Sequence, residues 1–240
     1  MFLKNIAIIT FITELLPLVV AFVFFKKIKA NYLKVFFVYL ILLAFFASFS
    51  LYLLYFIKSK TAYLFVLRCY IAIEYSIFTY FFYLLIIPKF LKNLLIFSVT
   101  LFLGFCIFDY FESNSAVFNN YPALVEFSIF ILIIIYYFFQ KMNVVSGVPL
   151  LSTISFWFCV GLFIYFTGNL SFLIFIRYTK DHALINQMQL IYSCVTIAKN
   201  IILAAAWFAH EKLQTDADII QLPENMKLDD DFTFTNTTNP

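Results

Sequence analysis

The stretch CVTIAKNIILAAAWF, residues 194–208, is apolar for most of its length and carries one lysine, Lys199, in its middle. A helix that crosses the hydrocarbon core of a bilayer needs about 20 predominantly apolar residues. An ammonium group inside such a helix is costly unless other helices supply partners for it. The stretch therefore predicts a membrane-spanning helix and, around Lys199, a polar site within the membrane.

The rest of the chain has the same character. Of its 240 residues 64% are hydrophobic and only 12% are charged, and 35 of them are Phe and 16 are Tyr. Globular proteins carry about 25% charged residues. A soluble domain could not bury so much apolar surface, so the composition predicts an integral membrane protein whose main partner is the lipid bilayer. No basic block indicates a nucleic-acid partner.

Apolar runs long enough to span a membrane recur along the chain, separated by basic or turn-forming segments such as KKIKANYLK (26–34) and ESNSAVFNNYP (112–122). The first run contains Glu14 and Pro17 and has no convincing cleavage site, so we interpret it as a retained helix and not as a signal peptide. An all-α bundle of seven transmembrane helices is predicted. The seven runs are roughly 5–25, 35–57, 63–87, 94–111, 123–139, 151–176 and 186–209.

The Lys and Arg residues of the short loops predict the orientation, because cytoplasmic loops carry the larger share of them. The bias places the amino terminus outside and the carboxyl tail in the cytoplasm, as expected for a multi-pass protein of the cell inner membrane. The richer side holds Lys26, Lys27, Lys29, Lys34, Lys89, Lys92, Lys141 and Lys212, and the poorer side holds Lys4, Lys58, Lys60, Arg177 and Lys180.

The last segment, residues 210–240, is acidic and too short to form a domain of its own. Two interpretations stay open for it. It is either a disordered, solvated end or a docking peptide through which residues 213–240 bind a cytoplasmic signalling protein. The sequence also leaves a homo-oligomer open as a partner.

Three charged residues are predicted to form an intramembrane charge site. At 1.5 Å per helical residue, Glu14, Glu74 and Lys199 all lie near the middle of the membrane. Two acids and one base leave an excess negative charge, so we expect one glutamate to pair with Lys199 and the other to hold a proton or a cation. An ion pair that only fixes the packing of the helices is the alternative.

Polar residues on the last two runs are candidates for the lining of a cavity near this site. In the seventh run they recur at spacings of four, three and four residues, which places them on one helix face. In the sixth run Gly161 and Gly168 follow one face, where they would allow a neighbouring helix to approach closely. The candidate lining residues are Gln189, Ser193, Thr196 and Asn200 of the seventh run, and Trp157, Tyr165 and Asn169 of the sixth.

Arg68, Asp109 and Glu126 lie near the outer ends of their runs and are predicted to form an outer rim above the charge site. Such a rim would attract cations or amines. Ordinary interfacial charge is the alternative.

Signatures of catalysis and of cofactor binding are absent from the sequence. There is no Walker loop, HExxH or GxSxG motif, and the two histidines, His182 and His210, are predicted at opposite membrane faces. The four cysteines show no metal or redox spacing. We therefore expect neither enzymatic activity nor a metal or other cofactor.

Two resemblances bear on the function. Seven helices with an acid in the third and a lysine in the seventh resemble microbial rhodopsins, but Val195 stands where those proteins carry an aspartate, so a retinal protein is not expected. The whole chain resembles uncharacterised stand-alone seven-helix membrane proteins of Bacteroidota that accompany signalling proteins. That resemblance rests on RCYIAIEYSIF (68–78), FWFCVGLFIYFTGN (156–169) and YSCVTIAKNIILAAAWF (192–208).

The resemblance implies a sensory or membrane-subunit role and assigns no residue. With no room for a catalytic domain outside the membrane, the sequence favours a sensor or membrane-embedded subunit that passes an outer or intramembrane signal to a cytoplasmic partner. A small proton- or cation-coupled transporter or channel is the second interpretation. A structural assembly subunit is the third.

Overall fold

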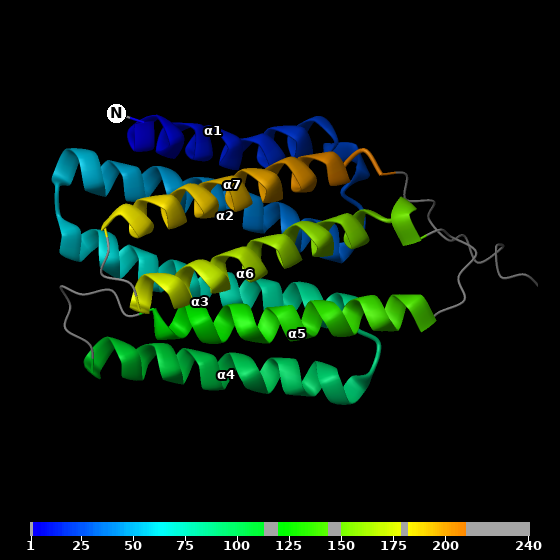
Figure 1. Ribbon diagram of the computed structural model, residues 1–240. Helices are drawn as coiled ribbons and strands as arrows, with labels where there is room; N and C mark the ends of the chain where they lie inside the picture. The colour runs from blue at the N-terminus through cyan, green and yellow to red at the C-terminus, as the bar shows by residue number, and fades with distance from the viewer. Residues whose placement is uncertain (1, 113–119, 144–149, 179–181, 210–240) are drawn as a thin grey trace, which may run out of the picture.

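The fold is a bundle of long α-helices, seen here in a computed structural model that describes residues 2–112, 120–143, 150–178 and 182–209 (Figure 1). Within these residues there are seven α-helices and no strand. They are α1 (Phe2–Val23), α2 (Asn31–Tyr52), α3 (Lys60–Leu85), α4 (Lys89–Glu112), α5 (Tyr121–Asn143), α6 (Ile154–Tyr178) and α7 (His182–Ala206), with short helical turns η1 (Phe25–Lys27), η2 (Leu53–Ile57) and η3 (Leu150–Ser152).

Helices α2 to α7 each contain a stretch that is long and apolar enough to cross a membrane, and α1 contributes a shorter apolar stretch, Ile9–Val23, within the described residues. Large apolar side chains cover the outside of the bundle, as in α4, where Phe97 and Phe108 are more than half exposed. Such a surface suits lipid and not water. The predicted all-α membrane bundle is confirmed.

Each helix packs against the next in the chain, and α7 packs against α1, so the bundle closes on itself. Helix α3 also contacts α5, which leaves α4 on the outer side of that pair, as Figure 1 shows. The core between the helices is largely aromatic. Phe78, Phe130 and Phe166 contact one another from α3, α5 and α6, with ring centroids 5.2 to 5.6 Å apart.

Two helices are longer than their apolar runs predicted. Helix α4 begins at Lys89 and α5 continues to Asn143, because lysine and glutamine are good helix formers and can reach the membrane surface with their polar ends. The Gln140 side chain of α5 caps the end of α3. It accepts a hydrogen bond from the Ile87 N–H (3.0 Å) and donates one to the Leu85 carbonyl (3.1 Å), which satisfies polar groups at the end of α3.

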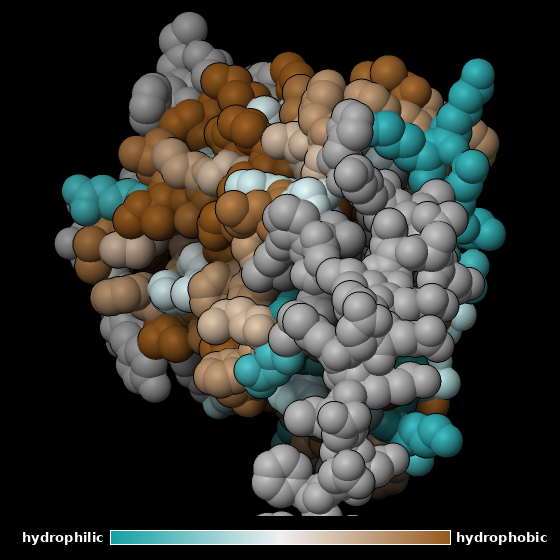
Figure 2. All heavy atoms as spheres, turned by 90° about the vertical axis from the view of Figure 1, so that its right-hand side faces the viewer, coloured by the Kyte–Doolittle hydropathy of each residue, from teal (hydrophilic) through white to brown (hydrophobic). Residues whose placement is uncertain are grey.

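The end of the bundle where α1 finishes and α2 begins carries exposed lysines, among them Lys26, Lys29, Lys34 and Lys89. Figure 2 looks onto this end, and hydrophilic side chains lie around its edge. We refer to it as the lysine-rich end. The segment 210–240, for which the sequence predicts a tail, lies outside the described residues.

Helices α6 and α7 approach each other closely at the two glycines that the sequence singled out. A Cβ atom on Gly168 would lie 2.6 Å from the Val195 Cγ1, and one on Gly161 would lie 2.9 Å from the Leu203 Cδ2. By contrast, a Cβ atom on Gly104 of α4 would meet nothing within 4 Å. The prediction that these glycines of the sixth run admit a neighbouring helix is confirmed for α6 and α7.

Candidate functional site

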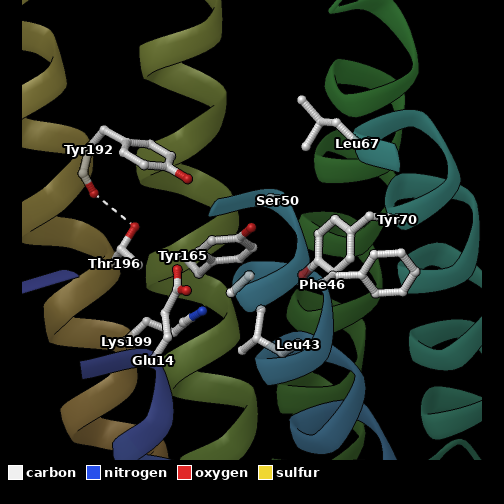
Figure 3. A pocket seen from close by; sticks show the side chains of 11 residues that line it. Glu14, Leu43, Phe46, Ser50, Leu67, Tyr70, Tyr165, Tyr192, Thr196 and Lys199 are labelled. Atoms are coloured by element: carbon white, nitrogen blue, oxygen red, sulfur yellow. Dashed lines mark hydrogen bonds between the residues drawn. The ribbon is translucent and has the colours of Figure 1, made fainter. Parts of the chain in front are cut away.

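A cavity of about 130 Å³ lies in the middle of the bundle between α1, α2, α3, α6 and α7. It is large enough for several water molecules or a small polar ligand. Figure 3 shows its lining, in which Glu14 of α1 and Lys199 of α7 point toward each other below the Tyr165 ring of α6. Tyr70, Tyr192 and Thr196 supply further polar groups, and Leu43, Phe46, Ala47, Ser50 and Leu67 complete the wall.

Lys199 is the central cation of this site. Only 1% of its surface is exposed, and its Nζ lies 4.4 Å from the centre of the Tyr165 ring, within range of a cation–π interaction. Its positive charge also interacts electrostatically with the carboxyl groups of both Glu14 and Glu74. The three residues that the sequence placed at one depth therefore share one electrostatic environment, with the ammonium group acting on two acids.

Glu74 is held by two tyrosines. Its Oε1 accepts hydrogen bonds from the Tyr70 hydroxyl (2.7 Å) and from the Tyr39 hydroxyl (3.2 Å), and its side chain is 2% exposed. These donors stabilise negative charge on a group that water does not reach. The sequence analysis missed both tyrosines. Tyr70 could have been found, since it stands four residues before Glu74 on the same helix face, but nothing in the sequence places Tyr39 of α2 beside them.

A second cavity of about 240 Å³ adjoins the first and shares four lining residues with it, Glu14, Ala47, Ser50 and Tyr192. Its remaining lining includes Thr10, Leu51, Tyr63 and Ser193. These residues lie toward the end of the bundle where α1 and α3 begin, opposite the lysine-rich end. The two cavities therefore form one space, lined in part by polar groups, that extends from Lys199 toward that end.

On the other side of Lys199 the bundle is closed by aromatic rings. Phe36 stacks on Phe158 at 3.8 Å between ring centroids, Phe158 meets Trp207 at 5.3 Å, and Phe36 meets Phe81 at 5.6 Å. All four side chains are fully buried. We call these four residues the aromatic layer. It separates the cavity from the lysine-rich end.

The predicted lining residues of α7 have different surroundings. Thr196 lines the first cavity and Ser193 the second. Asn200 is fully buried and its Nδ2 donates to the Thr13 hydroxyl of α1 at 3.3 Å, so it joins two helices without lining either cavity. Gln189 is exposed on the outside of the bundle. Positions 189 and 200 differ by only about 20° around the helix axis, so the difference in burial comes from their places along α7, where Gln189 lies about two turns from the start of the helix and Asn200 lies deeper in the bundle.

Of the candidates on α6, only Tyr165 lines the cavity. The Trp157 indole N–H donates to the Leu151 carbonyl at 2.8 Å, near the start of α6 and far from Lys199. Asn169 is buried and lies outside the lining of both cavities. Trp157 and Asn169, which the sequence proposed as lining residues, therefore line neither of these two cavities.

The three residues that the sequence predicted to form an outer rim are buried or half-buried in the bundle. Arg68 is half-buried, with its guanidinium group 5.5 Å from the centre of the Tyr110 ring. Asp109 is 5% exposed and Glu126 is 0% exposed. The two acids face the interior because Asp109 and Glu126 stand on the inner faces of α4 and α5, a rotation that apolar runs on all sides could not reveal.

The described residues offer no group of three His, Cys, Asp or Glu side chains that could hold a metal ion. Cys69, Cys106, Cys159 and Cys194 are free thiols. What the cavity can do chemically follows from its lining. The Glu14 carboxyl group, the Lys199 ammonium group and tyrosine hydroxyls line this space, and the buried Glu74 carboxyl group is hydrogen-bonded to one of these tyrosines, Tyr70; such a set can bind a proton, a small cation or a small polar molecule.

The hydroxyl of Tyr70 makes a testable contribution to this site. Tyr70→Phe removes the shorter of the two hydrogen bonds to Glu74 and lowers the free energy of unfolding in detergent by about 1–2 kcal/mol, because a buried carboxyl loses a donor. Tyr80→Phe is the matched control, since Tyr80 lies on the same helix with its side chain 53% exposed. Equal stabilities of the two variants would contradict the role given to Tyr70.

No protein-family model, no curated protein and no solved structure matches this chain.

Proposed function

We propose that this protein is a non-enzymatic membrane sensor or membrane-embedded subunit. In this proposal the cavity around Glu14, Glu74 and Lys199 receives a proton, cation or small polar ligand, and the bundle passes the event to a partner at the lysine-rich end. The supporting observation is a fully buried lysine, Lys199, that lines one cavity together with Glu14 and interacts electrostatically with the buried Glu74 as well. Buried charges inside a membrane are costly and mark functional sites by default.

The shape of the site favours sensing over conduction. The polar space extends from Lys199 toward only one end of the bundle, and the aromatic layer closes the other direction. A ligand could therefore enter and leave from the same side. With the orientation predicted from the loop lysines, that side is the outside of an inner membrane, and the lysine-rich end faces the cytoplasm.

Helix α7 offers a direct mechanical connection from the site to that end. It carries Lys199, and two turns later Trp207 accepts a hydrogen bond at its carbonyl from the Lys27 Nζ at 3.4 Å. The Phe24 and Phe208 rings also contact each other, with centroids 4.9 Å apart. A change in the pairing of Lys199 would shift α7 against α1 and α6, and the chain leaves α7 directly into residues 210–240.

Purification of the tagged protein from its native host in a mild detergent, followed by mass spectrometry, tests the partner. We expect a stoichiometric cytoplasmic protein that is lost when residues 213–240 are deleted, because the acidic tail is the only substantial segment outside the predicted spans. A deletion that leaves the bound protein unchanged would contradict tail docking. Recovery of the protein alone from wild-type cells would contradict the sensor proposal itself.

A proton- or cation-coupled transporter is the second candidate, favoured by the two buried acids beside a polar cavity. It requires the aromatic layer to open during a transport cycle. Flux into proteoliposomes that is abolished by Glu74→Gln, with Glu112→Gln as the control at an exposed acid, would favour transport over sensing.

A further inference from the structure

Glu126 of α5 is a buried acid that the cavity does not explain. Its side chain is 0% exposed, and neither Oε1 nor Oε2 has a hydrogen-bond partner. Asn169 of α6 is 1% exposed, and its Nδ2 and Oδ1 are likewise without partners. Groups of this kind are rarely left unsatisfied, since each unmet donor or acceptor costs free energy comparable to a lost hydrogen bond.

The two side chains lie at one level of the bundle. Helices α5 and α6 run antiparallel, and Phe127 contacts both Tyr165 (5.8 Å between ring centroids) and Phe166 (5.5 Å). Glu126 precedes Phe127 by one residue, and Asn169 lies one turn beyond Tyr165 and Phe166 on the same helix face. The antiparallel pairing therefore brings the carboxyl and amide groups to the same depth on facing helices.

The charged and titratable groups around Glu126 come from three neighbouring helices. The charge that acts on Glu126 is the negative charge of Glu74 on α3. Glu126 also interacts electrostatically with Tyr75 of α3, Cys106 of α4 and Tyr165 of α6. Cys106 interacts in the same way with Asp109 of α4. A carboxylate at this position would have no donor and would face a second acid, which is the most costly arrangement for a buried charge.

We propose that Glu126 and Asn169 form a second intramembrane site, which holds a proton on Glu126 and a water molecule between the carboxyl and amide groups. The carboxylic acid O–H donates to the Asn169 Oδ1. The water donates to the remaining carboxyl oxygen, and the Asn169 Nδ2–H donates to the water. Each of the unpartnered atoms then has a partner, and no charge remains uncompensated.

The proton on Glu126 also matters to the charge site. Because the Glu74 and Glu126 charges repel each other, a neutral Glu126 allows Glu74 to stay ionised beside Lys199. Loss of that proton would place a second negative charge near Glu74 and would favour protonation of Glu74. The second site does not depend on the signalling role proposed above.

Infrared spectroscopy of the full chain in detergent tests this inference, because a protonated carboxylic acid has a C=O stretch distinct from that of a carboxylate. At neutral pH we expect carboxylic-acid absorption, one component of which is lost in Glu126→Gln, shifted in Asn169→Leu and unchanged in Glu112→Gln. We also expect Glu126→Gln to keep the wild-type thermal stability, since one neutral group replaces another of the same shape.

Three results would overturn the proposal. A band unaffected by Glu126→Gln would show that this carboxyl is ionised. A carboxylate band that responds to exchange of sodium for choline would show a cation in place of the proton. A band that Asn169→Leu leaves at its wild-type frequency would show that the amide and the bridging water are not part of the site.

Discussion

Lys199→Met lowers the free energy of unfolding by about 3–5 kcal/mol, the size expected when one partner of a buried charge group is removed. Methionine has a similar volume, so the loss comes from the charge. Glu14 and Glu74 then stay inside the bundle without the cation that interacts with both of them. The measurement is unfolding of the purified protein in mixed micelles by increasing denaturing detergent.

Two further variants separate the charge effect from general damage. Lys34→Met removes an exposed lysine at the start of α2 and is expected to leave the stability unchanged. The double variant Lys199→Met with Glu74→Gln is expected to recover part of the loss, because it also removes a negative charge. A Lys199→Met protein as stable as Lys34→Met would contradict the electrostatic role of the site.

Gly168→Ala lowers the free energy of unfolding by about 1–3 kcal/mol, because the new Cβ atom would lie 2.6 Å from the Val195 Cγ1 and must force α6 and α7 apart. Differential scanning fluorimetry of Gly168→Ala and Gly104→Ala in the same detergent measures the effect. Gly104→Ala is the matched control. It adds the same methyl group where nothing lies within 4 Å, and alanine favours the helix by up to about 1 kcal/mol.

Val195 allows the clash to be relieved. In Gly168→Ala combined with Val195→Ala, the side chain that meets the new Cβ atom is gone, so we expect most of the lost stability to return. Equal melting temperatures for Gly168→Ala and Gly104→Ala would show that the two helices can separate at this point without cost. That outcome would contradict the close packing of α6 against α7 at Gly168.

The helices and the depth of their charged residues could be predicted from the sequence, since both depend on composition and on a rise of 1.5 Å per residue. Glu14 and Lys199 do share a cavity, as their common depth suggested. Close packing at Gly161 and Gly168 was also predictable, because small residues at this spacing have one main use in membrane helices.

The rotation of each helix could not be predicted. Apolar residues surround these helices on nearly every side, so no polar face shows which side chains point inward. Glu126 was consequently expected at a rim and is fully buried, and Trp157 was expected at the cavity and lies near the start of α6. The contact between Tyr39 and Glu74 depends on the relative rotation of α2 and α3, which single-sequence patterns do not contain.

The most direct test of the proposed coupling uses an isosteric change at the charge site and measures binding of a partner at the lysine-rich end of the bundle. Glu14→Gln keeps the shape of the cavity lining and removes one of the two acids that act with Lys199. The measurement is the amount of cytoplasmic partner that co-purifies with Glu14→Gln relative to wild type, at equal expression and equal melting temperature. We predict a several-fold change in bound partner. An unchanged amount would contradict the claim that the buried site controls what binds at the lysine-rich end.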